Sequence, residues 1–326
     1  MTNENALENV AVDFITFDHA TGLVKQEVDR KLSASPKTVR DYMQHLTLSW
    51  GKFIRAVSLL VCAQNKDGLI HPDAVKFASA IEILHLATLV HDDVIDNAKL
   101  RRGIITLQKK YGRRSAVICG DYLFCLAIQQ ASSVSDRKDY INFEMPDYMS
   151  RICLGELKQN QNNHNLDLSV FNYLKIISGK TAALFEASFY AGAILCKEAK
   201  DEINKYVRLG HYIGMIFQLT DDCIDFEAPQ QLAKKPVQSD YEQGVITLPL
   251  IYAFQQQGSF KEKARTDDVS RSEINAAVSE TGGLNYTRLV SKKYYNKAFG
   301  IIRSLNAADE KKEALKAILD KAYNGL

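Results

Sequence analysis

The chain has 326 residues, of which 46% are hydrophobic and 25% are charged. These proportions are ordinary for a folded globular protein, and they exclude a chain that is disordered throughout. The formal net charge of +2 provides no global basic field, so we expect no nucleic-acid partner. Glycine and proline number only 17 and 6. Because helix interiors tolerate both residues poorly and turn-rich β folds need many of them, this scarcity predicts an all-α fold.

The N-terminal sequence and the cysteines indicate a cellular compartment. The first ten residues, MTNENALENV, are polar and acidic, unlike a secretory signal peptide. No uncharged apolar run approaches the roughly 18 residues of a membrane span. The six cysteines form no CxxC motif and stand among apolar residues. We therefore expect a cytoplasmic protein without a membrane span, whose thiols are buried and reduced.

Apolar residues recur with helical spacing along most of the chain. Strong patterns predict helices, in chain order, over residues 6–32, 36–47, 51–64, 73–97, 114–134, 139–161, 168–196 and 200–226. After a looser stretch at 227–246, weaker patterns predict helices near 247–257, 271–280, 284–305 and 309–323. The segment 182–196 is nearly all apolar or small, as in a helix that other helices surround. We predict one all-α domain over residues 1–326, a bundle of roughly ten or more helices.

Two of the apolar helices end in the same acidic pattern, DDxxD. The helix 73–97 closes with Asp92, Asp93 and Asp96, and the helix 200–226 closes with Asp221, Asp222 and Asp225. At about 100° per residue, His85, Thr88, Asp92 and Asp96 form one polar stripe, and Gln218 lies on the stripe of the second cluster. One such cluster has an ordinary explanation as a solvated helix end. Two copies, each closing a core helix, indicate a function, because buried like charges are costly without cations.

Oxygen ligands without histidine or cysteine at metal spacing favour a hard cation. Mg²⁺ takes one or two carboxylates and completes its shell with water and phosphate oxygens. Two carboxylate clusters that face one cavity would therefore hold a diphosphate through Mg²⁺. Basic residues that could bind its phosphates stand near both clusters: Lys52, Arg55, Lys99, Arg101, Arg102, Lys180, Lys234 and Lys235.

These residues form a recognisable pattern. From roughly residue 45 to residue 305, the chain resembles the trans-isoprenyl diphosphate synthases, the polyprenyl synthetase family, and is most similar to bacterial hexaprenyl and heptaprenyl diphosphate synthases. The motifs that carry the resemblance are both DDxxD clusters, Leu100-Arg101-Arg102-Gly103, Gly120-Asp121-Tyr122-Leu123, Gly155-Glu156-Leu157, Lys180-Thr181-Ala182-Ala183-Leu184-Phe185, Phe217-Gln218-Leu219-Thr220, Lys235-Pro236 and Thr247-Leu248-Pro249-Leu250.

The resemblance implies the isoprenoid synthase fold around a central prenyl-diphosphate cavity, with roughly three Mg²⁺ ions in each loaded active site. By this resemblance Asp92, Asp96 and Asp221 are Mg²⁺ ligands, and Asp93, Asp222 and Asp225 lie close by or bind through water. The family resemblance assigns the allylic diphosphate to Arg101, Lys180, Thr181, Gln218 and Lys235. It assigns isopentenyl diphosphate to Lys52, Arg55, His85 and Arg102.

The implied reaction joins an allylic diphosphate to isopentenyl diphosphate. The allylic C–O bond ionises, the double bond of isopentenyl diphosphate attacks the cation, and the released diphosphate removes a proton. No protein base is required, so we do not assign that role to His91. The chain departs from the family's usual GGKRxRP in its Gly51-Lys52-Phe53-Ile54-Arg55-Ala56, where Phe53 replaces an arginine and Ala56 a proline.

The resemblance also bears on product length. Bulky residues four and five positions before the first aspartate stop the chain short in this family, and here Thr88 and Ala87 are small. Leu84 lies one turn deeper, and Phe124 is a candidate for a deeper floor. We expect a C30–C40 product, with a C20 product as the alternative.

Other functions and assemblies stay open. A class I terpene cyclase shares the first DDxxD but normally carries a different second metal motif, and a non-catalytic prenyl-diphosphate-binding subunit typically loses aspartates, whereas all six are present here. We expect a homodimer, to which the segment 114–134 could contribute, with a small regulatory subunit as the alternative. Release of the product could involve peripheral contact with a membrane.

Overall fold

Helices form nearly all the regular structure of this chain. The computed structural model describes residues 13–48, 50–134, 147–227, 241, 243–267 and 269–325. Its first helices are α1 (Phe17–Ser33), α2 (Lys37–Leu46), α3 (Ile54–Cys62), α4 (Asp73–Ile95), α5 (Leu107–Tyr111), α6 (Arg113–Ala131) and α8 (Tyr148–Gln161). They are followed by α9 (Val170–Ile177), the π-helix η1 (Ser178–Ala182), α10 (Ala183–Leu195), α11 (Lys200–Glu227), α13 (Leu248–Gln256), α14 (Gly258–Thr266), α15 (Arg271–Thr281), α16 (Gly283–Ser304) and α17 (Asp309–Asn324). The predicted all-α class is confirmed.

Helix α4 lies in the middle of one half of the bundle. The helix follows Pro72, and the acidic Asp73 stands in its first turn. A negative charge there interacts favourably with the positive N-terminal end of the helix dipole. The helix packs against α1, α3, α6 and α10, so apolar residues are needed on several of its faces. It is the one helix of the described ranges that is long and apolar enough to cross a membrane, yet half of its apolar window is buried inside this fold. Its apolar character therefore has an explanation in helix packing.

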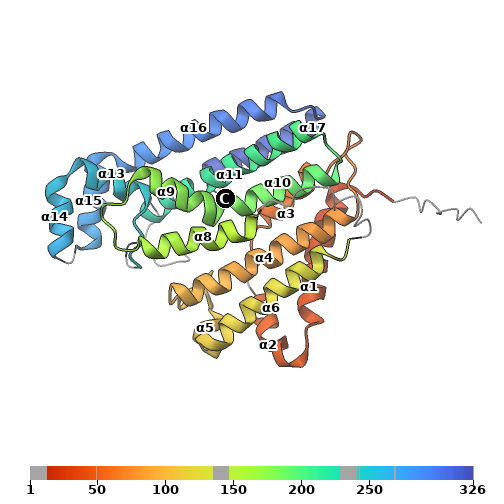
Figure 1. Ribbon diagram of the computed structural model, residues 1–326, viewed down its shortest axis with the longest axis horizontal. Coiled ribbons are helices and arrows are strands. Elements are labelled where there is room, and N and C mark those ends of the chain that lie inside the picture. The colour runs from red at the N-terminus through yellow and green to blue at the C-terminus, as the bar shows by residue number, and fades with distance from the viewer. Residues whose placement is uncertain are drawn as a thin grey trace, which may run out of the picture.

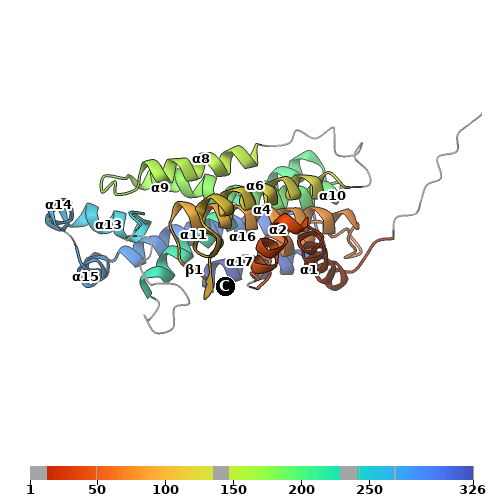
Figure 2. The same cartoon turned by 90° about the horizontal axis from the view of Figure 1, so that it is seen from below.

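Helix α11 has the same place in the other half of the bundle. It packs against α10, α16, α17 and η1 (Figure 1). Tyr206, Leu209, Ile213 and Ile216 are at most 1% exposed and join one core cluster. Figure 2 shows α8 and α9 along one face of the bundle, away from α1 and α2. The two helices that end in DDxxD are thus both central, with other helices around them.

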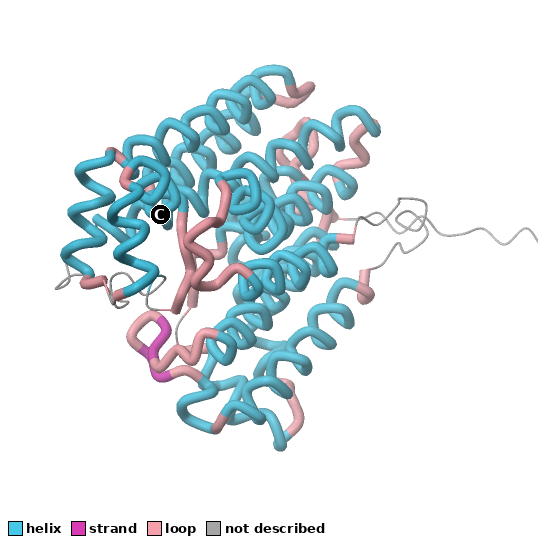
Figure 3. Tube along the Cα trace, turned by 60° about the vertical axis from the view of Figure 1, so that its left-hand side comes forward, coloured by secondary structure: helices cyan, strands magenta, loops and turns pink. Residues whose placement is uncertain are grey.

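A small hairpin follows α4 directly. Strands β1 (Leu100–Arg101) and β2 (Ile104–Ile105) pair antiparallel, and they form the only sheet of the described residues (Figure 3). The two turn residues, Arg102 and Gly103, have φ angles of 51° and 79°. Positive φ at both central positions is the geometry of a type I′ turn, which matches the twist of paired strands. The hairpin turns the chain sharply, so that Arg101 and Arg102 stay beside the end of α4.

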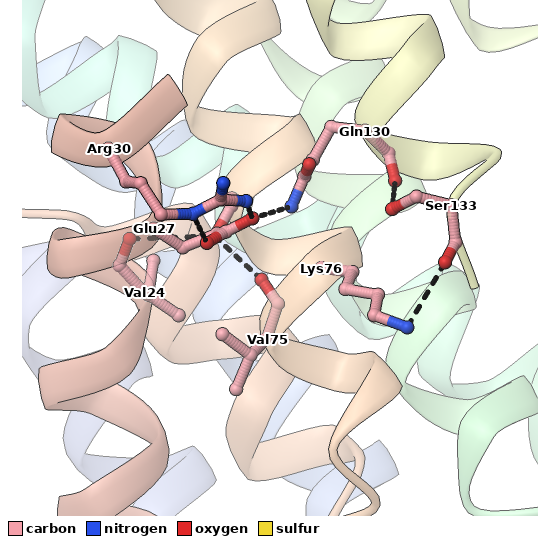
Figure 4. A network of polar contacts seen from close by, with 8 residues as sticks. Val24, Glu27, Arg30, Val75, Lys76, Gln130 and Ser133 are labelled. Atoms are coloured by element: carbon pink, nitrogen blue, oxygen red, sulfur yellow. Dashed lines mark hydrogen bonds and ion pairs between the residues drawn. The ribbon is translucent and has the colours of Figure 1, made fainter. Parts of the chain in front are cut away.

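Polar contacts fasten α1 to the bundle (Figure 4). Glu27 of α1 accepts hydrogen bonds from Arg30 at 2.6 and 2.7 Å and from the Gln130 amide of α6 at 2.9 Å. Lys76 of α4 donates to the backbone oxygen of Ser133, just beyond α6, at 3.1 Å. These hydrogen bonds link α1 to α6, and α4 to the residues that follow α6.

The predicted helices agree with the structure in most of their bounds. The differences are the π-helical turn inside the predicted segment 168–196, the start of α1 at Phe17, and the unpredicted β hairpin, α5 and α14. Helix α5 has only five residues, too few to show a period. Helix α14 fully buries none of its residues, and only Phe260 and Ala264 pack partly against the core, too few for a clear apolar stripe. Parts of two predicted helices, residues 6–12 of 6–32 and residues 139–146 of 139–161, lie outside the described residues.

The prediction of six buried thiols is wrong for half of them. Cys125 and Cys153 are exposed and Cys196 is half-buried, while Cys62, Cys119 and Cys223 are buried. The exposed pair stand on α6 and α8, which also expose large apolar residues such as Ile118, Ile128 and Leu154. Apolar neighbours in the sequence therefore do not imply burial on these two helices.

A buried carboxylate connects α8, α10 and α11. Glu186 of α10 accepts two hydrogen bonds from the Arg151 guanidinium, at 2.6 and 2.8 Å, and lies 2.8 Å from Nδ1 of His211. Burial alone would raise the pKa of Glu186, but the hydrogen bonds from His211 and Arg151 outweigh burial and lower the pKa. The charged carboxylate is therefore the form that stabilises the fold.

We predict that Glu186→Gln lowers the free energy of unfolding at pH 7 by about 1–2 kcal/mol, less than for a fully buried pair because the Arg151 side chain is 38% exposed. Since the pKa in the folded state lies below the ordinary 4.5, this stabilisation is present above pH 4.5 and is lost as the pH falls through the folded value. Chemical unfolding curves at several pH values measure the difference. Glu262→Gln, at an exposed pair with Arg265, is the control and should unfold like the wild type; a difference for Glu186→Gln that grows toward low pH would contradict the prediction.

Candidate active site

One large cavity receives the ends of both acidic helices. Its volume is about 1020 Å³, and its wall is drawn mainly from α3, α4, α8, η1 and α11 and from the loops beside them. The predicted site residues in this wall are Lys52, Arg55, His85, Thr88, Asp92, Asp96, Arg101, Arg102, Lys180, Thr181, Gln218, Asp221 and Asp222. Residues far apart in the sequence thus meet at one place, as the two DDxxD copies predicted.

Four other predicted residues do not line the cavity. Leu84 and Ala87 are buried in the core cluster that α4 shares with α6. Asp93 is 6% exposed and accepts a hydrogen bond of 2.8 Å from Nε of Arg101. Asp225 lies one turn beyond Asp221, outside the cavity wall. The last predicted site residue, Lys235, lies outside the described residues, as does Lys234.

The carboxylates fit a cation that is held partly by its substrate. Within the described ranges, no three His, Cys, Asp or Glu side chains gather closely enough to hold a metal ion by themselves. Asp92, Asp96 and Asp221 nevertheless face the same cavity from two helices. This arrangement suits Mg²⁺, which keeps several waters and completes its coordination with substrate phosphate oxygens rather than in an all-protein cage.

Asp222, next to Asp221, is held by protein groups. It is 1% exposed, and its Oδ2 accepts a hydrogen bond from the Tyr173 hydroxyl. Its Oδ1 accepts a hydrogen bond of 2.9 Å from Nε2 of Gln218, whose own Oε1 accepts one of 2.7 Å from the Thr181 hydroxyl. Asp221, by contrast, is exposed. The two neighbouring aspartates therefore have different surroundings.

Lys180 lines the same cavity as Asp92 and interacts with its charge. It belongs to the π-helix η1, an insertion of the kind that is common at functional sites, and its Nζ lies 2.8 Å from Oε2 of Glu156. Burial would lower the pKa of Lys180, but the negative charges of Glu156 and Asp92 outweigh burial and raise it. Burial raises the pKa of Asp92 to about 7, against the opposing effect of Lys180. A cation in the cavity would favour the charged form of Asp92.

In the second group of basic residues, Arg55 is buried, whereas Lys52 and Arg102 are exposed. Arg55 is 8% exposed, its guanidinium lies 4.6 Å from the centre of the Phe185 ring, and burial lowers its pKa to about 10. Its Nε has no hydrogen-bond partner within the described structure. Burial and the charges of Arg55 and Arg102 lower the pKa of His85 well below its ordinary value, so His85 is neutral. A cationic pocket with an unpaired buried donor is suited to a phosphate group.

Phe53 stands at the point where the sequence departs from the family pattern. It precedes α3 with a left-handed backbone, φ 52° and ψ 31°, and its ring lies 5.5 Å from that of Trp50. Both aromatic rings line the cavity beside Lys52. The replacement of an arginine by Phe53 thus turns one cationic part of the wall into an apolar one, while Lys52 and Arg55 stay in place.

Several polar residues of this wall were not predicted from the sequence, among them Glu82, Glu156 and Tyr173. Glu82 lies beside Arg55 and accepts a hydrogen bond of 3.0 Å from the backbone N–H of Ala56, in the first turn of α3. Glu156 was quoted only as part of a motif, and Tyr173 was not singled out. Glu82 could have been found as a charge on the apolar helix 73–97, three residues before His85. No sequence signal separates Tyr173 from the other tyrosines of the chain.

The chain was compared with known families and structures. A family model described as polyprenyl synthetase matches residues 36–281, more than half of the chain. The chain belongs to the polyprenyl synthetase family. It is 31% identical over 287 residues to heptaprenyl diphosphate synthase component 2 of Geobacillus stearothermophilus, which covers 86% of this chain and 88% of that protein. The predicted enzyme class, prenyltransferase, and reaction class, polyprenyl diphosphate synthesis, are confirmed.

Two solved structures support the same fold. Heptaprenyl diphosphate synthase from Staphylococcus aureus superposes with a TM-score of 0.86 at 30% identity, covering 95% of this chain and 99% of that one. A polyprenyl synthase from Caulobacter crescentus, in complex with calcium and isoprenyl diphosphate, superposes with a TM-score of 0.84 at 26% identity, covering 94% and 95%. The predicted isoprenoid synthase fold is confirmed.

Close backbone contact between α8 and η1 holds Lys180 in position. An alanine Cβ at Gly155 would lie 2.3 Å from the backbone nitrogen of Lys180 and 2.7 Å from the carbonyl carbon of Gly179. We predict that Gly155→Ala forces α8 and η1 apart, lowers the free energy of unfolding by about 1–3 kcal/mol and reduces kcat/KM. Gly300→Ala on α16, where a Cβ meets nothing within 4 Å, is the matched control and should be neutral or stabilising. Equal stability and activity for both variants would show that the contact is not required.

Proposed function

We propose that this chain acts as a single domain that condenses isopentenyl diphosphate with an allylic diphosphate in the cavity described above. The observation that carries the proposal is that Asp92, Asp96 and Asp221, from two separate DDxxD helices, line the same cavity as two groups of basic residues. In this proposal these three aspartates hold Mg²⁺, roughly three ions in the loaded site, while Asp93, Asp222 and Asp225 support them or act through water. When bound, Mg²⁺ supplies positive charge to the leaving diphosphate.

The two basic groups divide the substrates between them. Arg101, Lys180, Thr181 and Gln218, with Lys235 from its place in the sequence, bind the allylic diphosphate beside the aspartates. Lys52, Arg55, His85 and Arg102 bind isopentenyl diphosphate, and neutral His85 contributes a hydrogen bond while the arginines contribute charge. Two diphosphates, each with several negative charges, need separate cationic sites, because they would otherwise repel each other.

The protein's part in the reaction is electrostatic and steric. As the allylic C–O bond breaks, Lys180 and Arg101 stabilise the charge that develops on the departing diphosphate. The apolar wall, which includes Leu89, Phe124 and Leu184, excludes water that would trap the allylic cation. The double bond of isopentenyl diphosphate then forms the new C–C bond, and a proton leaves to the released diphosphate. Atoms and charges balance without a protein base.

Product length follows from the same wall. Thr88, one turn before Asp92, lines the cavity, as does Phe124 of α6, and both stand where a growing hydrocarbon would pass. Leu84 and Ala87 act behind this wall through the packing of α4 against α6. We propose a C30–C40 product, in keeping with the heptaprenyl names of the two relatives described above, and a C20 product is the alternative.

The assembly and location of the enzyme are also part of the proposal. We propose a cytoplasmic homodimer that releases its product at a membrane surface. The name "component 2" of the Geobacillus stearothermophilus relative supports the alternative, in which a small regulatory subunit completes the enzyme. Analytical ultracentrifugation of the chain purified alone, compared with the chain recovered from its host, distinguishes a homodimer from a complex with a small subunit.

The reaction itself is tested with purified chain, Mg²⁺, farnesyl diphosphate and labelled isopentenyl diphosphate. We expect labelled polyprenyl products only when both substrates are present. A hydrocarbon formed from farnesyl diphosphate alone would instead identify a terpene cyclase. Binding of farnesyl diphosphate without any product, also after the native partners are added back, would identify a non-catalytic binding subunit.

The metal-ligand assignment predicts a large effect of single substitutions. Asp92→Asn and Asp221→Asn should each reduce kcat by at least about 10²-fold, because each removes a carboxylate that holds positive charge against the leaving group. Circular dichroism should show an unchanged helical fold, since both side chains face a cavity. Glu262→Gln, on exposed α14, is the control of equal chemistry and should keep wild-type turnover. Wild-type turnover in either aspartate variant would refute the assignment.

The cavity wall predicts the direction of a change in product length. Thr88→Phe adds an aromatic ring to the path of the growing chain, so the product should shorten by at least one isoprene unit. Dephosphorylated products are sized by chromatography, and Phe124→Ala serves as the opposite change, which should lengthen the product. An unaltered product distribution in both variants would place the end of the pocket elsewhere.

A further inference from the structure

A chain of hydrogen bonds runs from Tyr173 to the cavity wall through three structural elements. Tyr173 of α9 donates its hydroxyl hydrogen to Oδ2 of Asp222 on α11. Asp222 Oδ1 accepts from Gln218 one turn earlier on the same helix, at 2.9 Å. Gln218 Oε1 in turn accepts from Thr181 of η1, at 2.7 Å. The network therefore ends beside Lys180, where the proposed function places the allylic diphosphate.

The carboxylate of Asp222 has little freedom in this network. At 1% exposure it cannot obtain hydrogen bonds from bulk water, and a buried carboxylate that loses a donor pays a large desolvation cost. Tyr173 holds one oxygen and Gln218 the other. Removing the tyrosine hydroxyl takes away the hydrogen bond at Oδ2, and a change in the orientation of the carboxylate would also change its bond to Gln218.

The position of Gln218 depends on that carboxylate. A primary amide donates through nitrogen and accepts through oxygen, so its contacts decide which end faces which neighbour. Asp222 can only accept in its charged form and therefore fixes the amide nitrogen toward itself. The amide oxygen is then left to accept from Thr181. One N–H of the same amide group stays available for a phosphate oxygen in the cavity that Gln218 lines.

We propose that Tyr173 is a positioning residue for the allylic diphosphate, acting through Asp222 on Gln218 and Thr181. Asp222 then serves the substrate through its neighbours rather than as a direct ligand of the cation. The inference rests on the proposed function of the cavity. The Tyr173 ring itself is 4% exposed and packs in a core cluster with Ile176, Met215 and Leu219, so phenylalanine can replace it without loss of packing.

The test is a steady-state comparison of Tyr173→Phe with the wild type, varying each substrate separately at saturating Mg²⁺. We expect kcat/KM for farnesyl diphosphate to fall about 10–100-fold, as is typical when a group behind a ligand is removed, while KM for isopentenyl diphosphate stays within twofold. Tyr206→Phe is the matched control. Its hydroxyl is also buried but has no hydrogen-bond partner among the described residues, and it should keep wild-type constants.

A double-mutant cycle separates positioning from general support of the fold. If Tyr173 acts through Gln218, then Tyr173→Phe should change kcat/KM by less than twofold in a Gln218→Ala background. Full additivity of the two substitutions would overturn the proposal, as would wild-type constants for Tyr173→Phe or an equal loss for both substrates. A wild-type chain that forms no product with both substrates, also after its native partners are added back, would overturn the proposed function and this inference with it.

Asp222→Asn tests the same network if Tyr173→Phe does not fold. The variant should raise KM for farnesyl diphosphate and leave the Mg²⁺ concentration for half-maximal activity within twofold of the wild type. An increase in that Mg²⁺ concentration of tenfold or more would identify Asp222 as a direct cation ligand and overturn the proposal.

Discussion

The main unfavourable interaction in this molecule is the concentration of negative charge in a largely apolar cavity. Asp92, Asp96 and Asp221 line this one cavity at the ends of two helices whose other faces are packed in the core. Burial, with smaller contributions from the negative charges of Glu156 and Asp96, raises the pKa of Asp92 to about 7 against the opposing effect of Lys180 and Arg101. The helices α4 and α11 must therefore be stabilised by packing against many neighbours, because their acidic ends add nothing favourable in the absence of cations.

The close approach of the helices follows from small residues at the points of contact. Gly155 and Gly179 let α8 touch η1, and at Gly214 of α11 a Cβ would lie 2.6 Å from the Cα of Ala182. A larger side chain at any of these places would separate the elements that carry Glu156, Lys180 and Asp221. The extra residue in the π-helical turn shifts Lys180 and Thr181 relative to the regular α10 that follows. Packing in the core thus decides the distances across the cavity.

Helix periodicity was enough to predict the all-α class and the meeting of the two acidic clusters. Apolar stripes identify core helices, and an aspartate pair that closes such a stripe is visible without coordinates. Periodicity could not separate Thr88, which lines the cavity, from Ala87, which packs against α6, because their directions on α4 differ by only about 100°. Periodicity also could not reveal the hydrogen bond between Tyr173 and Asp222, since the two residues are 49 positions apart in the sequence and lie on different helices.

The two DDxxD motifs share more than their letters. In each, the first aspartate lines the cavity and the second is buried and held by a donor of the protein: Arg101 for Asp93, and Tyr173 with Gln218 for Asp222. Adjacent helical residues point about 100° apart, so two neighbouring carboxylates have different surroundings: Asp93 lies outside the cavity wall, and Asp222 borders the cavity but is only 1% exposed. The second aspartate accepts a hydrogen bond from a side chain of the cavity wall, Arg101 in one motif and Gln218 in the other. Each motif thus pairs a carboxylate that lines the cavity with a buried one that holds a polar side chain of the cavity wall.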